Sequence, residues 1–597
     1  MKQGNLEKWT DVNSCKNLLF FSELVNELLF DYSIPSNRIS TLNSHYLCLD
    51  ALNAIDGIDN HGVPEGTLKP IMEELYSALQ KDVAFDFEND SPLRYFVKYQ
   101  NERYRISNSV SELSFLELKN AAQALHTHFF VDNKYYMSLK EKIQTIVLEN
   151  KEDEQPMLFR LVKSLLTELV NAGYSIKYIH DVMDRLFWTP RATITSPSQI
   201  NSFFEAFTFQ KEDYTVVFVV DKARMQKFVD FIDDLTLEST CDKLTDSSVE
   251  RIFLSLGKKQ AYLKLKRKAL DPYKAAFSAK YTIEINMAFY RLCDHFYKYN
   301  INYVKCGVYS QSAFFLAGRD LSAVSHTKTP SRKQIAESME ASEKAMRASR
   351  SQRSLDDRIS LLNAARFHSQ SLDSDSSENQ LLDLWAIFES TLDISNKHTS
   401  DRIAQVCMYL VPILKRRYIY SLFSQLTSDI RTYSEDEFLK IVGNISTEAE
   451  HVEKVCKFVL LDKFENERNT FLANCESYPL LKERMEYYHQ SLHTPFDVYN
   501  FVEKHAVRVK WQVMRIYRNR NLIIHNGESM PYLELLIENL HSYVDDFLTY
   551  VLHSFSEGHD INSMCQMLFA KECDWVTEFS NRKAEMNETV IEKILSM

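Results

Sequence analysis

Glycine and proline are scarce in this sequence, with only 11 and 13 of them among 597 residues. Tight turns and Gly-rich loops depend on these residues, so the shortage predicts a mainly helical chain. The phosphate-binding patterns G-x-x-x-x-G-K-[ST] and G-x-G-x-x-G are absent, and so is the zinc-protease pattern H-E-x-x-H. ATP-driven work and dinucleotide chemistry are therefore unsupported, and we expect no cofactor.

Cysteine is also sparse: there are ten, and no two are spaced C-x-x-C, so the pattern is not a zinc framework. We interpret them as reduced thiols of a cytoplasmic protein. No apolar run approaches the roughly 18 residues of a membrane helix, and the first residues lack a signal-peptide pattern. The net charge of −12 restricts any nucleic-acid binding to local basic patches.

The pattern of apolar residues predicts a mainly α protein with a smaller α+β domain. We expect four regions: a helical N-terminal region at 1–190, an α+β domain at 191–326, a polar and partly helical linker at 327–379, and a helical bundle at 380–597. The segment 187–201, with two prolines and little periodicity, marks the first boundary.

Short apolar runs in the second region predict a β-α-β-β-α-β order, the ferredoxin-like split unit. The expected strands are 214–220, 251–256, 261–268 and 302–309, with helices at 221–235 and from Pro272 onward, where Asp271 is the N-cap. The third strand belongs to a basic patch, 258–268. Alternation on that strand gives one face to Lys264, Lys266 and Lys268, with Lys258 nearby. The patch is either a solvated sheet face, the favoured interpretation, or a surface that binds phosphates of a nucleotide or phage-derived trigger.

His489 and His493 stand four residues apart, as zinc ligands on a helix can. No third ligand lies nearby in sequence, so we expect no metal.

The strongest signal is the segment 504–520, which carries six basic residues and no acid in an acidic chain: Lys504, Arg508, Lys510, Arg515, Arg518 and Arg520. It leads directly to Asn521 and His525. Arginine offers a planar, permanently charged fork for phosphate, and histidine moves protons near neutral pH. These groups suffice to cleave RNA, because the 2′-hydroxyl of RNA is itself the nucleophile.

The stretch Arg520-Asn521-Leu522-Ile523-Ile524-His525 resembles the R-N-x-x-x-H form of the HEPN superfamily motif. The resemblance covers about 380–560, where a helix carrying Glu389 precedes the motif and a closing helix follows it. It implies a helical-bundle endoribonuclease, found among toxins and antiphage defence proteins. Members usually form homodimers with two motifs facing one cleft, and they leave 2′,3′-cyclic phosphates without a metal. The resemblance assigns catalysis to Arg520, Asn521 and His525. The basic run that precedes the motif predicts RNA binding by Arg508, Lys510, Arg515 and Arg518.

Two arginines compete for the catalytic role, because Arg518 also precedes an asparagine and fits R-x6-H. On a continuous helix, Arg520 falls in the middle of the apolar face, whereas Arg518 falls on the side of His525. A buried Arg520 needs a partner, either Glu389 or RNA phosphate in a dimer cleft. The family pattern favours Arg520, and local unwinding near Gly527 would reconcile the two.

The function that we expect is a metal-independent endoribonuclease effector of the toxin or abortive-infection kind, with residues 1–330 sensing a trigger or restraining the nuclease. The alternative is a non-catalytic RNA-binding or scaffold protein built on a HEPN dimer.

Overall fold

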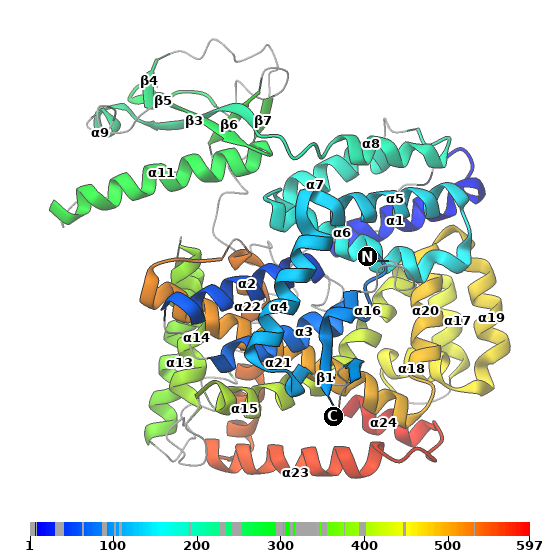
Figure 1. The fold of residues 1–597 in the computed structure, drawn as a ribbon. Helices are drawn as coiled ribbons and strands as arrows, with labels where there is room; N and C mark the ends of the chain where they lie inside the picture. The colour runs from blue at the N-terminus through cyan, green and yellow to red at the C-terminus, as the bar shows by residue number, and fades with distance from the viewer. Residues whose placement is uncertain are drawn as a thin grey trace. The chain divides into compact units, whose positions relative to one another are not determined.

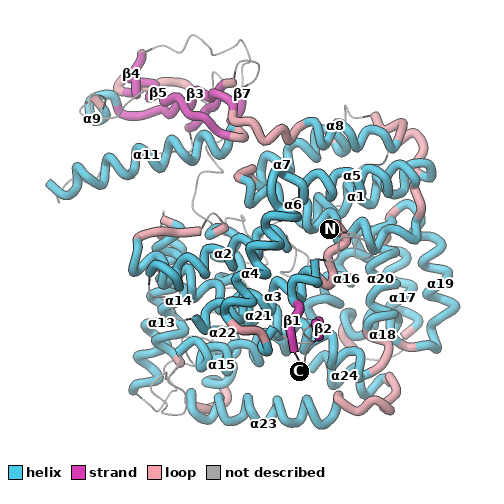
Figure 2. Tube along the Cα trace, in the orientation of Figure 1, coloured by secondary structure: helices cyan, strands magenta, loops and turns pink. Residues whose placement is uncertain are grey.

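A computed structural model of the chain describes residues 6, 9–29, 41–61, 65–85, 92–100, 103–106, 110–189, 193–226, 229, 235–239, 254–293, 303, 305–310, 314–316, 343, 347, 355–374, 376–392, 402–445, 449–530 and 532–596. Most of these residues are helical, and strands are confined to one small sheet and one hairpin (Figure 2). The predicted fold class, mainly α with a smaller α+β region, is therefore confirmed.

The chain divides into two compact units, and the division differs from the four predicted regions. The larger unit contains Met1–Glu168, Pro190–Ile200 and His326–Met597, and the smaller contains Leu169–Thr189 and Asn201–Ser325. N-terminal and C-terminal helices thus share one unit, a long-range association that local sequence patterns do not report.

The N-terminal part of the larger unit is helical, as predicted, apart from one antiparallel hairpin, which the sequence interpretation missed. The hairpin consists of β1 (Val97–Gln100) and β2 (Arg103–Ile106). The helices are α1 (Lys16–Leu28), α2 (Ser44–His61), α3 (Leu68–Leu79), α4 (Phe115–Leu125), α5 (Lys134–Glu149) and α6 (Gln155–Ala172).

The C-terminal part of the larger unit is helical throughout its described residues (Figure 1). In chain order the helices are α13 (Leu355–Asp373), α14 (Ser377–Thr391), α15 (Arg402–Arg416), α16 (Tyr418–Tyr433), α17 (Glu435–Asn444), α18 (His451–Leu460), α19 (Glu465–Asn474), α20 (Pro479–Ser491), α21 (Pro495–Asn526), α22 (Leu533–Ser556), α23 (Ile561–Phe579) and α24 (Glu588–Ser596). Helix α13 lies in the predicted linker and agrees with its partly helical character. Residues 327–342 of the linker lie outside the described residues.

Buried charges join the two parts of the larger unit. Arg484 of α20 pairs with Glu27 of α1 and with Asp429 of α16, at 2.5 Å in the second case, and all three side chains are buried. The backbone N–H of Leu480 donates to Glu23 at 3.2 Å. A buried carboxylate is tolerated only when it is paired, so these contacts hold α1 against α20.

The smaller unit carries a five-stranded antiparallel sheet in the order β4-β5-β3-β6-β7. Its strands are β3 (Glu212–Asp221), β4 (Leu235–Glu238), β5 (Gln260–Ala269), β6 (Cys306–Tyr309) and β7 (Phe314–Leu316); its helices are α7 (Ile176–Met183), α9 (Lys222–Met225) and α11 (Pro272–Cys293), and α8 (Ile200–Glu205) begins at the unit boundary. Helix α11 runs along one face of the sheet (Figure 1), and its apolar side chains share a core with those of the strands.

The chain order β3-α9-β4-β5-α11-β6 agrees with the predicted β-α-β-β-α-β order, with β7 added at the edge. Asp271 caps α11 as predicted, accepting the N–H groups of Tyr273 and Lys274 at 2.8 and 2.9 Å. The predicted second strand, 251–256, is wrong where it is described: residues 254–256 form a turn and loop, while Leu235–Glu238 pairs with β5 instead. The rest of that prediction, residues 251–253, lies outside the described residues.

Among the described residues, no helix combines the length and the apolar character needed to cross a membrane.

Candidate functional site

The motif lies at the C-terminal end of α21, a helix whose two ends follow from local sequence. Thr494 forms a capping box with Asp497, whose N–H donates to the threonine hydroxyl at 3.1 Å, and Pro495 occupies the first turn. Gly527 ends the helix in the left-handed region, with φ of 70°, and donates to the carbonyl of Ile523 at 3.0 Å. The helix is continuous between these residues, so the local unwinding that would reconcile the two arginines does not occur.

The apolar face of α21 ends before the motif does. Val513 and Ile516 are buried, whereas Ile524 is 47% exposed. Arg520 lies on the same face in helical projection, but its side chain is 22% exposed. Burial of Arg520 is thus only partial, because the helix extends beyond its apolar neighbours in the larger unit.

Arg520 is held between two helices by acceptors on both sides. Its Nη2 donates to Glu389 of α14 at 3.3 Å, and its Nη1 donates to the side-chain oxygen of Asn521 at 3.0 Å. Trp385 Nε1 donates to the other Glu389 oxygen at 3.1 Å, which fixes the carboxylate. A guanidinium has five N–H donors, so these contacts leave donors available for an anion. Of the two partners considered for Arg520, Glu389 and RNA phosphate in a dimer cleft, the structure contains the first.

Arg518 points to a different partner, although the two arginines are equally exposed at 22%. Its Nη2 donates to Asp50 of α2 at 2.8 Å, and Asp50 also accepts from the hydroxyl of Tyr532 at 3.5 Å. Asp50 is buried, so its charge is neutralised mainly by Arg518. The N-terminal helices therefore contact the motif segment directly.

Arg515 was predicted to bind RNA, and its position contradicts that role. Its side chain is only 2% exposed and pairs with Glu74 of α3, while Nη1 donates to Gln512 at 2.6 Å. Burial alone would lower the pKa of Arg515, but the Glu74 carboxylate raises it above its ordinary value. The local sequence contains no acid because the partner stands 441 residues earlier in the chain.

The other predicted residues of this helix lie at the surface. Arg508, Lys510 and His525 are exposed, and Asn521 is half-buried. Asn521 and His525 are four residues apart and therefore neighbours on the helix surface. The end of α21 thus presents a positioned guanidinium, an amide and an accessible imidazole, a set able to bind a phosphodiester and move protons.

The basic patch of the smaller unit has the predicted alternation. Leu263 and Leu265 are buried, while Lys264 is half-buried and Lys266 and Lys268 are exposed. Two of these lysines have acidic neighbours on adjacent strands. Lys264 pairs with Glu238 on β4, and Lys268 lies 3.9 Å from Asp213 on β3. Lys258 lies in the exposed turn before β5. Cross-strand pairing agrees with the favoured interpretation, a solvated sheet face.

The fold supplies a third potential metal ligand that the sequence did not reveal. Asp462 lies with His489 and His493, with one ligand atom of each within 4.8 Å of the others. However, His489 Nδ1 contacts the carbonyl of Val459 at 2.9 Å, and its Nε2 faces the Arg468 guanidinium at 3.3 Å. Burial and then Arg468 lower the pKa of His489. With both ring nitrogens engaged and a fixed cation adjacent, this group fits a hydrogen-bond network better than a metal site.

Comparison with models of protein families, with curated proteins and with solved structures finds no match for this chain. The case for a function therefore rests on the residues and contacts described above.

Proposed function

We propose that this chain is a metal-independent endoribonuclease of the HEPN type, acting in the cytoplasm as a toxin-like or antiphage abortive-infection effector. The observation that carries the proposal is the placement of Arg520. It is held by Glu389 and Asn521 at the exposed end of α21, just over one helical turn before the exposed His525. This arrangement supports the role of the motif that the family resemblance implies.

The proposed reaction needs only proton transfer and charge stabilisation. The 2′-oxygen of a ribose attacks the adjacent phosphorus and loses its proton to a base, while the bond to the 5′-oxygen breaks and that oxygen gains a proton. His525 acts as the base or the acid, and Arg520 stabilises the additional negative charge of the phosphorane. Asn521 orients the guanidinium. The products are a 2′,3′-cyclic phosphate and a 5′-hydroxyl.

The test is RNA cleavage by wild-type protein and His525→Ala in the presence of EDTA, with sequencing of RNA ends after expression in cells. We expect cleavage by the wild type only, with cyclic-phosphate ends. Equal activity of both proteins, or activity lost to EDTA, contradicts the mechanism. Lys571→Ala, an exposed charge change on α23, is the matched control.

We further propose that the N-terminal helices restrain the nuclease until a phage-derived or nucleotide trigger acts. In support, α2 and α3 supply the carboxylates of Asp50 and Glu74 to Arg518 and Arg515. These contacts neutralise the basic side of α21 next to the motif, where an RNA strand would otherwise be attracted.

A homodimer through the C-terminal helices is part of the proposal. Two facing motifs would supply two histidines, one for each proton transfer. The large apolar side chain of Ile524, 47% exposed beside the motif, is available for such a contact. Light scattering coupled to size-exclusion chromatography should give twice the chain mass for wild type and a smaller mass for Ile524→Asp; a monomeric wild type rejects the dimer.

The second candidate is a non-catalytic RNA-binding or scaffold protein. It is favoured by the pairing of three arginines of α21 with carboxylates: Arg515, Arg518 and Arg520. This alternative predicts salt-sensitive RNA binding that survives His525→Ala, with no cyclic-phosphate ends.

A further inference from the structure

Three segments of the larger unit bring positive side chains together away from the motif. Lys81 follows α3, Arg160 and Lys163 belong to α6, and Lys504 and Arg508 belong to the middle of α21. Burial lowers the pKa of Lys81, and nearby positive charges lower it further: those of Arg508, Lys504 and Arg160. Burial and then Arg508 lower the pKa of Lys163 to about 8. We refer to these five residues as the basic cluster.

Four members of the basic cluster differ from Arg515 and Arg518 in their surroundings. In the part of the chain that the structure describes, no carboxylate lies within 4 Å of four of its members: Lys81, Arg160, Lys504 and Arg508. About two to three turns after Arg508 on the same helix, Arg515 and Arg518 are both paired. Gathering like charges costs free energy in the empty protein, and a bound anion would recover it.

A groove lies next to the basic cluster, on α16. It has a volume of about 300 Å³ and is lined by Arg417, Tyr420, Ser421, Ser424, Gln425 and Ser428. Such a volume is at the lower end of the range typical of small-molecule sites, roughly 300–1,000 Å³. Its lining offers hydroxyl and amide groups for hydrogen bonds and one aromatic ring on which a base can stack.

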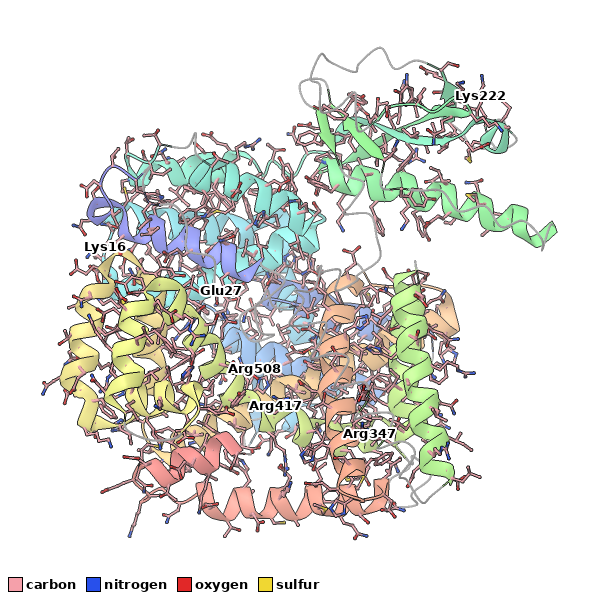
Figure 3. All side chains as sticks on the ribbon, turned by 180° about the vertical axis from the view of Figure 1, so that it is seen from behind. Lys16, Glu27, Lys222, Arg347, Arg417 and Arg508 are labelled. Carbon is pink, nitrogen blue, oxygen red and sulfur yellow. The ribbon has the colours of Figure 1, made fainter. Side chains whose placement is uncertain are left out.

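Packing joins the start of α16 to the 504–508 turn of α21. The rings of Tyr418 and His505 stack with centroids 3.6 Å apart and planes within 6°. Burial raises the pKa of Asp546 on α22, and the positive charge of Arg417 lowers it. Burial also raises the pKa of Tyr543, three residues earlier on α22, and the positive charge of Arg508 is among those that lower it. Figure 3 labels Arg417 and Arg508, and in that view they project onto neighbouring positions in the middle of this unit. The groove therefore opens beside the basic cluster.

We propose that the basic cluster and the α16 groove form one binding site for a phosphate-bearing ligand of nucleotide size. Arg508, Lys504 and Lys163 take the phosphates, and the groove takes the nucleoside around Tyr420. Because α3 and α6 contribute cations from the N-terminal part, the ligand would bridge them to the helix that carries the motif. This site goes beyond the proposed nuclease, since it needs neither Arg520 nor His525.

The same phosphate chemistry is available from a free nucleotide or from the 5′-phosphate of an RNA strand. The experiment therefore titrates ATP, inorganic tripolyphosphate and a 5′-phosphorylated RNA oligonucleotide into the full-length protein by calorimetry. We expect ATP to bind more tightly than tripolyphosphate and to displace from this site any oligonucleotide that occupies it. Equal affinities for ATP and tripolyphosphate, no ATP binding, or an oligonucleotide that ATP does not displace would overturn the proposal.

Variants locate the site. Arg508→Ala and Lys163→Ala should each weaken ATP binding at least tenfold, while Arg508→Lys retains most of it. Lys571→Ala is the control, because Lys571 is an exposed lysine of α23 outside the basic cluster. Equal loss in Lys571→Ala, or none in Arg508→Ala, rejects the assignment. Binding should survive His525→Ala, so its outcome is independent of RNA cleavage.

The pH dependence of ATP affinity distinguishes direct phosphate binding by Lys163 from a purely structural role, since a structural role predicts no change in affinity. As the pH rises through about 8, Lys163 loses its proton, so ATP affinity should fall between pH 7 and 9. Binding within that range should take up protons, because the bound anion favours protonated Lys163, and the loss of affinity should be smaller in Lys163→Ala. An affinity that does not change between pH 7 and 9 removes Lys163 from the site.

Discussion

Replacing Glu74 with alanine should destabilise the larger unit by about 3–5 kcal/mol, because it leaves Arg515 as a buried charge without its carboxylate. The Arg515 side chain is 2% exposed, so water cannot replace the lost partner. The reverse change, Arg515→Met, keeps the volume and leaves Glu74, which is 19% exposed and partly hydrated. Its cost should therefore fall at the lower end of that range.

The assay is differential scanning calorimetry of the full-length protein. With about 2.1 cal/mol/K of unfolding entropy per residue, a unit of roughly 450 residues has about 1 kcal/mol/K. A loss of 3–5 kcal/mol then lowers Tm by about 3–5 °C. The two units can unfold in separate transitions, so only the transition of the larger unit is compared. Glu73→Ala, at the neighbouring position of α3, is the control and should change stability by less than about 0.5 kcal/mol.

The double variant separates a structural role of Arg515 from the predicted role in RNA binding. If the pair is structural, the double variant Glu74→Ala/Arg515→Met should cost less stability than the sum of the two single changes. The double variant removes both charges, whereas each single change leaves one charge without its partner. If Arg515 instead binds RNA, Arg515→Met lowers RNA affinity while Tm changes by less than 1 °C. That second result would refute the reasoning.

Three further predictions follow from buried or paired carboxyl groups. Asp50→Asn should release Arg518 and steepen the dependence of log affinity for single-stranded RNA on log salt by about 0.7; an unchanged slope means that Arg518 does not reach phosphate. Burial raises the pKa of Glu483 to about 7, so the free energy of unfolding should fall as pH rises from about 4.5 to 7. Glu483→Gln should therefore be more stable than wild type at pH 8, by at most about 3 kcal/mol, and should show no such gain at pH 4. Asp271→Ala should destabilise the smaller unit by about 2–4 kcal/mol in urea unfolding, because the buried carboxylate caps α11 and accepts the N–H of Ser175 at 2.7 Å.

Local signals in the sequence predicted local structure well. Thr494, Pro495 and Gly527 mark both ends of α21, Asp271 marks the start of α11, and alternation places the lysines of β5 on the exposed face. In each case the residues that determine the feature lie within a few positions of one another. The strand that pairs with β5 was predicted at the wrong place because pairing between strands is not a local feature. The segment 251–256 is the more apolar run, but Leu235–Glu238 pairs with β5.

Contacts between distant segments were beyond this kind of reasoning. An acid-free stretch predicts an exposed basic surface, yet α2 and α3 supply Asp50 and Glu74 to that stretch from more than 400 residues away. Asp462 also lies close to His489 only in the fold, because the two residues belong to different helical segments. Glu389 was one of two partners considered for Arg520, because a cation on the apolar face of α21 needs a counter-charge, and the structure contains this pair.

The fold divides five of the six cations of the basic run into two groups with different electrostatics. Near the motif, Arg515, Arg518 and Arg520 are each paired with a carboxylate, so this end of α21 attracts anions weakly. In the preceding turns, Lys504 and Arg508 gain further cations from α3 and α6 instead. Arg508 lies about 25 Å along the helix from His525, given 1.5 Å per residue. Anion capture and catalysis are thus separable. Raising the salt concentration should weaken ATP binding at the basic cluster more than it alters single-turnover cleavage of bound RNA, and an equal effect on both would place them at one site.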